Sequence, residues 1–310
     1  MTDFFDHRTL RALSLRSLAA VLLVIVFGLP ARAQPLRILV TNDDGYNAPG
    51  IDALVTALST NPNLDLHVIA PATNSSGTGD QKTLTTITVT DAVTLSGFPA
   101  KSIGGFPADT VLFGTLQQLM GTPPDLVVSG INLGQNMTGD LIPASGTVGA
   151  AYWAARIGIP AIAVSASLSA PDYANAAIFA AHVVEKFRTN KGFQKKMKEA
   201  GPPYHGVVLN INYPTCTTGT AVRGAKIVAV GRLTTIAGYT LQMDMGGVQT
   251  WQVNPASGNF VNSDCTSTLT EPATDLEAWN NGFVAISPLD SDRSLAGRKL
   301  KQFKFVERLF

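Results

Sequence analysis

The chain has 310 residues, of which 45% are hydrophobic and 15% charged, and its formal net charge is +1. This composition is typical of a globular protein, and the length allows one large domain or two modest ones with a sizeable core. A net charge near zero argues against nucleic-acid binding, which requires clustered Lys and Arg. We therefore expect no nucleic-acid duplex among the partners of this chain.

The first 33 residues have the pattern of a secretory signal peptide. Three arginines precede an apolar run over residues 18–29, and Ala-Arg-Ala at 31–33 provides small residues at a cleavage site. The run is short for a membrane span, and an uncleaved anchor is the alternative. We expect cleavage after Ala33, so that the mature protein, residues 34–310, is periplasmic or secreted and has no membrane contact.

Strand-type and helix-type patterns alternate along residues 36–212. The expected strands cover residues 36–41, 66–70, 125–129, 161–165 and 206–212. The expected helices begin at Pro49, at a cap formed by Asp109, at Thr147 and at Pro171, and the last of them runs to Lys198. A β excursion outside the main sheet is expected at 83–95. This order predicts an α/β fold with a mostly parallel sheet covered by helices on both faces.

After residue 212 the sequence changes to Gly, Thr and polar residues. Short strands are expected at 226–230 and 282–287. We interpret residues 34–212 as the α/β core and 213–310 as a β-rich arm that pairs with another subunit and returns a final strand to the core. Cys216 and Cys265 lie in polar stretches of this arm, and an oxidising compartment would permit a disulfide between them. The sequence leaves open whether that disulfide forms.

Polar side chains follow three of the expected strands at their carboxyl ends. Asp43 and Asp44 follow the first strand, Ser76 follows the second, and Asn132 follows the strand over 125–129. In an open α/β sheet such exits meet at one edge, where ligands bind. Carboxylate, hydroxyl and amide oxygens are hard ligands that suit Mg²⁺ or Mn²⁺ better than zinc. The alternative is that the two aspartates only serve as turn and helix-entry residues.

The start of the helix at Thr147 is a candidate anion site. Ser145, Gly146 and Thr147 open that helix, and free N–H groups at a helix start bind phosphate well. An ordinary Ser/Thr cap is the alternative. A metal and a phosphate cradle together point to metal-assisted cleavage of phosphate esters.

Other hydrolytic mechanisms find little support in the sequence. None of the histidines lies in these turns, and neither a Gly-x-Ser-x-Gly elbow nor a Gly-Lys-Ser/Thr phosphate loop is present. A carboxyl ester hydrolase that uses Ser76 or Ser145 stays a remote alternative, because no motif supplies its histidine.

These motifs, in this order, resemble the SurE family of survival-protein nucleotidases. The opening Ile-Leu-Val-Thr-Asn-Asp-Asp-Gly-Tyr at 38–46 is similar to that family's signature almost letter for letter, and several motifs in fixed order are far more specific than any one of them. The matching segments lie within residues 38–51, 70–77, 107–109, 124–136, 145–148, 158–161, 209–214 and 274–289. The resemblance therefore covers nearly everything after the expected signal peptide.

The resemblance implies a phosphatase that uses one divalent metal ion, Mg²⁺ or Mn²⁺, on nucleoside 5′- and often 3′-monophosphates. It implies a Rossmann-like core with a swapped carboxyl-terminal arm in a homodimer or homotetramer. The metal ligands would be Asp43, Asp44, Ser76 and Asn132. The phosphate contacts would be Asn42, Gly77, Asn136, Ser145, Gly146 and Thr147.

The leading hypothesis from the sequence is thus an exported, metal-dependent phosphomonoesterase of nucleoside monophosphates. Asp43 or Asp44 would also act in catalysis, as a metal ligand or as a general base. The alternative is a periplasmic protein of the same fold that binds nucleotides or anions without turning them over.

Overall fold

The structure is a computed structural model that describes residues 34–119, 121–198, 206–232, 236–255, 263–289 and 301–309. The chain divides into two compact units, residues 1–35 and 36–310, and the helices and strands of the described residues belong to the second. The expected signal peptide over 1–33 lies outside the described residues. In the part of the chain that is described, no helix combines the length and the apolar character needed to cross a bilayer.

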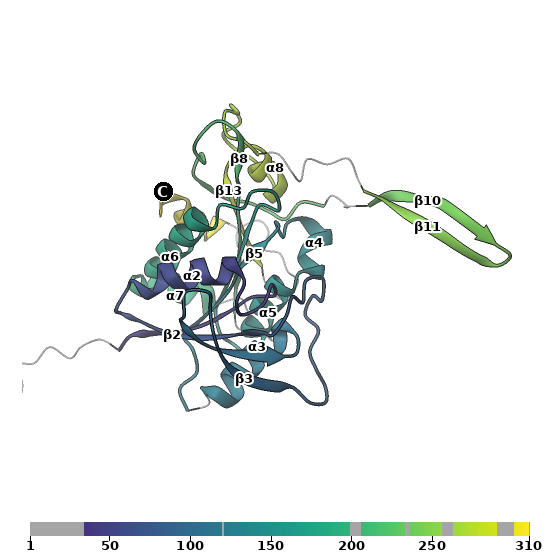
Figure 1. The fold of residues 1–310 in the computed structure, drawn as a ribbon. Helices are drawn as coiled ribbons and strands as arrows, with labels where there is room; N and C mark the ends of the chain where they lie inside the picture. Colours follow the sequence, from purple (N-terminus) through teal and green to yellow (C-terminus); the bar gives the residue numbers. More distant parts are fainter. Residues whose placement is uncertain are drawn as a thin grey trace, which may run out of the picture. The chain divides into compact units, whose positions relative to one another are not determined.

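Within the described residues, one sheet of nine strands forms the centre of the unit (Figure 1). Its spatial order is β3-β4-β2-β1-β5-β6-β7-β13-β9. In chain order these strands are β1 (Leu36–Thr41), β2 (Leu64–Pro71), β3 (Thr88–Val93), β4 (Pro99–Gly104), β5 (Leu126–Leu133), β6 (Ala161–Ala166), β7 (Val208–Tyr213), β9 (Ala225–Ile227) and β13 (Val284–Leu289). In this spatial order, each strand from β4 through β2, β1, β5 and β6 to β7 pairs in parallel with the next, which confirms the predicted fold class.

One edge of the sheet differs from the prediction. The excursion at 83–95 was expected to lie outside the main sheet, but its strand β3 pairs antiparallel with β4 along the sheet edge. The pattern of β4 does not predict a strand, because its run Pro-Ala-Lys-Ser-Ile-Gly is only half apolar. Lys101 of β4 pairs with Asp91 of β3 at 2.7 Å, a polar face that is typical of an edge strand.

Helices cover both faces of the sheet, as the alternation of strands and helices predicts. On one face α2 (Pro49–Ser59) and α6 (Tyr173–Thr189) pack against Ile38 and Val40 of β1. On the other face α3 (Pro107–Phe113) and α5 (Gly146–Arg156) pack near Leu39. Successive strand residues point to opposite faces, so a continuous apolar run in β1 serves both layers.

Two helix boundaries correct the prediction. The helix expected from Pro171 to Lys198 is two helices, α6 and α7 (Lys191–Lys198), because Asn190 has extended backbone and its side chain accepts the N–H of Phe193. This break turns Phe193 into the core. Asp109 was expected to cap its helix, but α3 begins at Pro107, and Asp109 accepts the Phe106 N–H from the third helical position.

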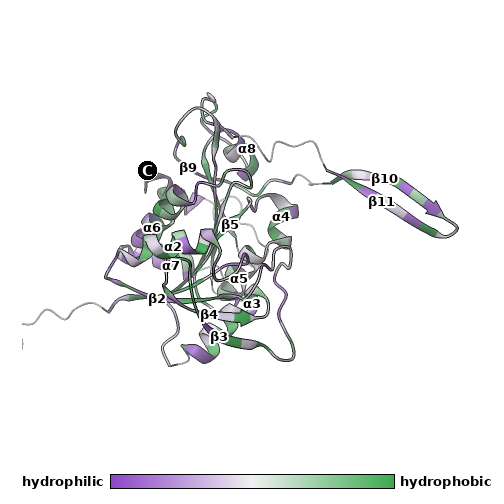
Figure 2. Cartoon of the chain, viewed as in Figure 1, coloured by the Kyte–Doolittle hydropathy of each residue, from purple (hydrophilic) through white to green (hydrophobic). Residues whose placement is uncertain are grey.

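The remaining elements lie between or after those of the sheet and its two helix layers in the chain. They are η1 (Gly114–Gln118), α4 (Thr138–Ala144), β8 (Cys216–Thr218), β10 (Ile236–Met245), β11 (Val248–Pro255), β12 (Ser263–Asp264), α8 (Asp275–Asn280) and η2 (Lys304–Leu309). The antiparallel pair β10 and β11 forms a hairpin, and Figure 2 shows apolar and polar residues interspersed along it. Cys216 of β8 and Cys265, which follows β12, form a disulfide, the bond that the sequence left open.

Candidate active site

The Asp-Asp turn leaves the central strand β1 at the carboxyl edge of the sheet. Asn42 braces this turn, since its amide Nδ2 donates to the Gly45 carbonyl at 2.8 Å and its Oδ1 accepts the Gly45 N–H at 3.2 Å. Gly45 has a φ of +112°, in the left-handed region that favours glycine. The structure thus gives Asn42 a bracing role, and its expected phosphate contact stays a prediction.

Asp43 is a buried carboxylate held by the start of α5. Its Oδ1 accepts the Thr147 hydroxyl proton at 2.6 Å. Burial raises the pKa of Asp43, while the Thr147 hydroxyl and the N–H groups of Thr147 and Gly146 lower it. Asp43 therefore lies at the helix start where the sequence predicts a phosphate, and the expected phosphate contacts of Gly146 and Thr147 stay predictions.

Asp44 points to the exit of β5 and is only half-buried. Its Oδ2 accepts the Leu133 N–H at 2.9 Å, and its Oδ1 accepts the amide of Asn74 at 3.4 Å. Burial raises the pKa of Asp44 to about 6; the Leu133 N–H opposes this rise and the Asp43 charge adds to it. The Asp44 charge also contributes, after burial, to raising the pKa of Tyr173 to about 12.

Ser76 and Gly77 lie on the loop that follows β2, next to the Asp-Asp turn. The N–H of Ser75 donates to the Asp43 carbonyl at 2.7 Å, and the N–H of Ser76 donates to Asn74 Oδ1 at 2.8 Å. Asn74 thus joins this loop to Asp44, a role that the sequence does not predict. Ser76 and Gly77 are exposed, and the space beside the Gly77 Cα is open.

Asn132 lies where β5 departs from regular pairing. The register with β6 shifts between Ser129 and Asn132, and such an irregularity re-aims a side chain at a sheet rim. The Asn132 amide donates to the Gly134 carbonyl at 2.6 Å. Its Oδ1 is buried and has no hydrogen-bond partner among the described residues, which is an unusual state for an amide oxygen.

Asn136 is buried in a network of amides below this loop. Its backbone N–H donates to Asn212 Oδ1 at 2.7 Å, and its side chain donates to Ser165 Oγ at 2.9 Å. Asn210 donates to its carbonyl at 2.7 Å. Asn136 therefore anchors the loop to β6 and β7, and its expected phosphate contact stays a prediction. Asn residues inside β7, a buried strand, were the signal that could have revealed this network.

The first residues of α5 are fixed by the closeness of Asp43. Ser145 is the helix cap, because its Oγ accepts the Val148 N–H at 3.1 Å. A Cβ on Gly146 would lie 2.8 Å from the Asp43 Cβ, so the approach requires glycine. These contacts join Asp43, Gly146 and Thr147 directly, and the turn also brings Asp44 to the Asn132 loop.

Comparison with known proteins bears on what this site is. The family model described as "Survival protein SurE" matches residues 38–236. The chain belongs to the SurE family. The "5'-nucleotidase SurE" of Desulforamulus reducens is 37% identical over 265 residues, covering 83% of this chain and 93% of the relative. That of Methanospirillum hungatei is 34% identical, covering 82% and 86%. The crystal structure of "Sure Protein" from Aquifex aeolicus has a TM-score of 0.65 at 30% identity, covering 87% of this chain and 99% of that one.

The candidate SurE ligands fit a divalent cation. The residue types are two carboxylates, a hydroxyl and an amide oxygen, the set that Mg²⁺ and Mn²⁺ prefer. A cation would give the buried Asn132 Oδ1 the partner that the described residues do not supply, and it would offset the buried charge of Asp43. The described residues contain no cluster of three or more His, Cys, Asp or Glu.

Proposed function

We propose that this SurE protein is an exported, divalent-metal-dependent phosphomonoesterase that converts nucleoside 5′- and 3′-monophosphates to nucleoside and phosphate. The observation that carries the proposal is the meeting of the Asp-Asp turn with the loop of Asn132, whose buried Oδ1 lacks a partner among the described residues. Thr147 fixes Asp43 in the same place. The relatives named 5'-nucleotidase support the reaction class.

Each residue of the site would have a separate task. Asp43, Asp44, Ser76 and Asn132 would hold the cation, which supplies charge neutralisation at the phosphoryl group when it is bound. Thr147 holds Asp43 in one orientation, and Asn42 holds the turn between the carboxylates. Asp44, the less buried carboxylate, takes a proton from the attacking water. The Ser145 hydroxyl and the open backbone at Gly77 would contact the phosphate.

The decisive experiment is a screen of metals against substrates with residues 34–310. We expect phosphate release from nucleoside monophosphates with Mg²⁺ or Mn²⁺, and its loss in Asp43→Asn, which removes one ligand. Nucleotide binding by calorimetry without phosphate release under any metal would favour the non-catalytic alternative. Activity that survives chelation would favour the serine esterase alternative.

Export is supported by the Cys216–Cys265 disulfide, since such bonds persist in oxidising compartments, and by the signal pattern over 1–33. Fractionation of cells that express residues 1–310 tests it. Activity that stays in the cytoplasm would overturn export without touching the catalytic proposal.

We also propose that the partner of the β10–β11 hairpin is a second copy of the chain, in a homodimer or homotetramer. An isolated hairpin is marginal in water. This one exposes large apolar side chains, among them Tyr239, Met245 and Trp251. Light scattering of the wild type and of Trp251→Ser tests this, and a monomeric wild type would contradict it.

A further inference from the structure

Two large apolar side chains are exposed beside the candidate metal site. Leu133 is 45% exposed and Leu168 is 66% exposed. Leu133 follows Asn132 directly, and its N–H donates to Asp44 Oδ2. Leu168 lies on the segment between β6 and α6. Ligand sites are lined mainly by apolar side chains with a few polar groups, so these leucines are candidates for contact with the organic part of the substrate.

Leu168 reaches the loop of Asn132. A Cβ at Gly134 would lie 3.6 Å from Leu168 Cδ1 and 3.9 Å from Asn132 Nδ2. One methyl-sized group at that point would contact both side chains, so Leu168 lies within one small group of a candidate metal ligand. The Leu168 N–H also donates to Gln135 Oε1 at 3.4 Å, which joins the two segments.

Leu133 faces the side of the sheet on which α6 packs. It pairs with Ala166 in β6, and paired residues of neighbouring strands point to the same face. Ala166 belongs to the core cluster that this face shares with α6. Tyr173, the first residue of α6, packs against the same cluster, and burial, and then the Asp44 charge, raise the pKa of its phenol to about 12. The start of α6 therefore lies near both Leu133 and Asp44.

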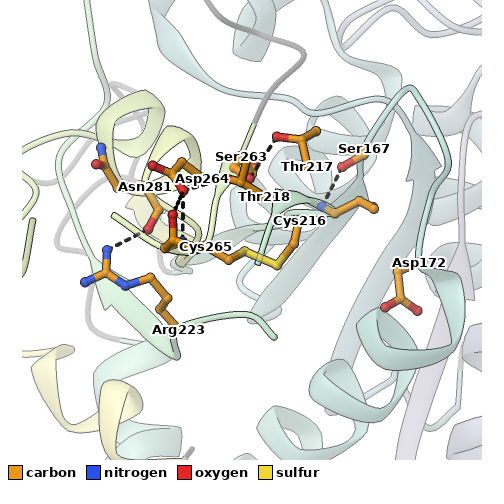
Figure 3. Close-up of a disulfide and its surroundings, with 12 residues drawn as sticks. Ser167, Asp172, Cys216, Thr217, Thr218, Arg223, Ser263, Asp264, Cys265 and Asn281 are labelled. Carbon is orange, nitrogen blue, oxygen red and sulfur yellow. Dashed lines mark hydrogen bonds between the residues drawn. A yellow bond between two sulfur atoms is a disulfide. The ribbon is translucent and has the colours of Figure 1, made fainter. Parts of the chain in front are cut away.

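The segment that carries Leu168 is fixed at both ends. Ser167 is buried, and its Oγ accepts the Thr215 N–H at 2.8 Å, beside the disulfide (Figure 3). At the other end the side chain of Asp172 caps α6. These anchors hold Leu168 beside the Asn132 loop while its side chain stays exposed. A ligand that contacts it therefore pays little for ordering the protein.

The base of a nucleotide fits this position. A single ribose joins the base to the phosphate, so the base lies within the length of one sugar from a phosphate at the metal site. The two leucine side chains carry no charge and no hydrogen-bonding group, so they suit the flat face of a heterocycle, which every base presents. They offer nothing to a second phosphate, which would lose its water without gaining a partner.

We propose that Leu133 and Leu168 form a base-binding surface, and that the protein prefers nucleotides to sugar phosphates because of it. The proposal rests on the proposed nucleotidase function. The two leucines are specificity residues, since they contact the base and not the reacting phosphate. A second copy of the chain that covers them is the competing occupant.

The test compares kcat/KM for adenosine 5′-monophosphate and for ribose 5-phosphate, which lacks the base. For the wild type we expect about a tenfold preference for the nucleotide, the size of effect that a small apolar contact gives. Leu168→Ser should raise KM for the nucleotide about tenfold and leave its kcat and both constants for ribose 5-phosphate unchanged, because the contact is the same in ground and transition states. Leu133→Ser should act in the same direction. Leu168→Met keeps an apolar side chain of similar volume and should retain the preference.

Leu116→Ser is the matched control. Leu116 is 59% exposed on η1, which leads to the start of β5, so the substitution removes the same side chain away from the strand exits and should change neither substrate. A wild type that treats both substrates alike, or a Leu168→Ser that weakens both equally, would overturn the proposal. Light scattering of Leu168→Ser should give the wild-type mass, and a smaller assembly would overturn the proposal in favour of a second copy.

Failure of the nucleotidase function itself looks different, because neither substrate would then release phosphate. Calorimetry with the same two compounds then decides. Tighter binding of adenosine 5′-monophosphate than of ribose 5-phosphate, lost in Leu168→Ser, supports the base-binding surface. Equal binding of the two compounds, or no binding of either, refutes it.

Discussion

Thr147→Val tests whether the start of α5 orients a metal ligand. The Thr147 hydroxyl donates to Asp43 Oδ1 at 2.6 Å, and both side chains are buried. Valine has a similar shape, so the substitution mainly removes the donor. A hydrogen bond to a charged group contributes about 1.5–3 kcal/mol, which corresponds to roughly a tenfold to hundredfold change in an equilibrium constant. Partners of metal-binding side chains affect metal affinity by about 10–100-fold, the same range.

The measurement is Mn²⁺ binding by calorimetry together with the Mn²⁺ dependence of phosphate release. We expect Thr147→Val to weaken Mn²⁺ binding by about 10–100-fold, with a smaller change in substrate KM at saturating metal. Thr147→Ser keeps the hydroxyl and should restore binding. Thr189→Val is the matched control, because that hydroxyl only bonds to the Glu185 carbonyl at the exposed end of α6.

Unchanged Mn²⁺ affinity in Thr147→Val would refute the reasoning. If substrate KM rose while metal affinity stayed the same, Thr147 would contact the phosphate, which is the role that the sequence alone predicts. The two roles are therefore separated by one pair of titrations.

Three other close contacts in the chain lead to predictions. Gly146→Ala should lower kcat/KM by about a hundredfold, because the new Cβ would lie 2.8 Å from the Asp43 Cβ and displace that side chain. Gly139→Ala is the control and should leave kcat/KM unchanged, because its Cβ would lie 3.8 Å from the Gly231 carbonyl oxygen, an ordinary contact. Dithiothreitol should lower the free energy of unfolding by about 4 kcal/mol, because the disulfide closes a separation of 49 residues. An unchanged urea midpoint would contradict this. Asp275→Ala leaves three buried N–H groups without their acceptor and should cost about 3 kcal/mol, measured by thermal melting.

The sequence predicts the centre of the fold well because its signals there are local. The apolar run of β1 and the polar residues after it indicate a buried strand and its exit. The break at Asn190 has a weak local signal, because the helix-like pattern continues on both sides of the capping Asn190. The edge-on packing of Phe193 against Phe187, at 5.9 Å between ring centroids, accompanies the break and is not visible in the pattern.

The sequence likewise predicts only part of the candidate site. The residue types that would hold a cation can be found at the strand exits, since parallel strands bring their exits to one edge. The residues that orient these side chains cannot be predicted from the sequence, because Thr147 lies 104 residues from Asp43 and Leu133 lies 89 residues from Asp44. Only the fold shows that a carboxylate, Asp43, lies against the helix start that is expected to bind phosphate.

The Asp-Asp turn joins parts of the molecule that are otherwise separate. Asp43 and Asp44 are adjacent in one bend after β1, yet Asp43 reaches α5 while Asp44 reaches the exit of β5. The same geometry makes the carboxylates unequal, since Asp43 is buried under donors from the helix and Asp44 keeps an exposed side. A carboxylate fixed by several donors is suited to hold a ligand, whereas an open one can exchange a proton with water. The adjacent pair would therefore provide both proposed roles from a single turn, in which Gly45 takes a positive φ.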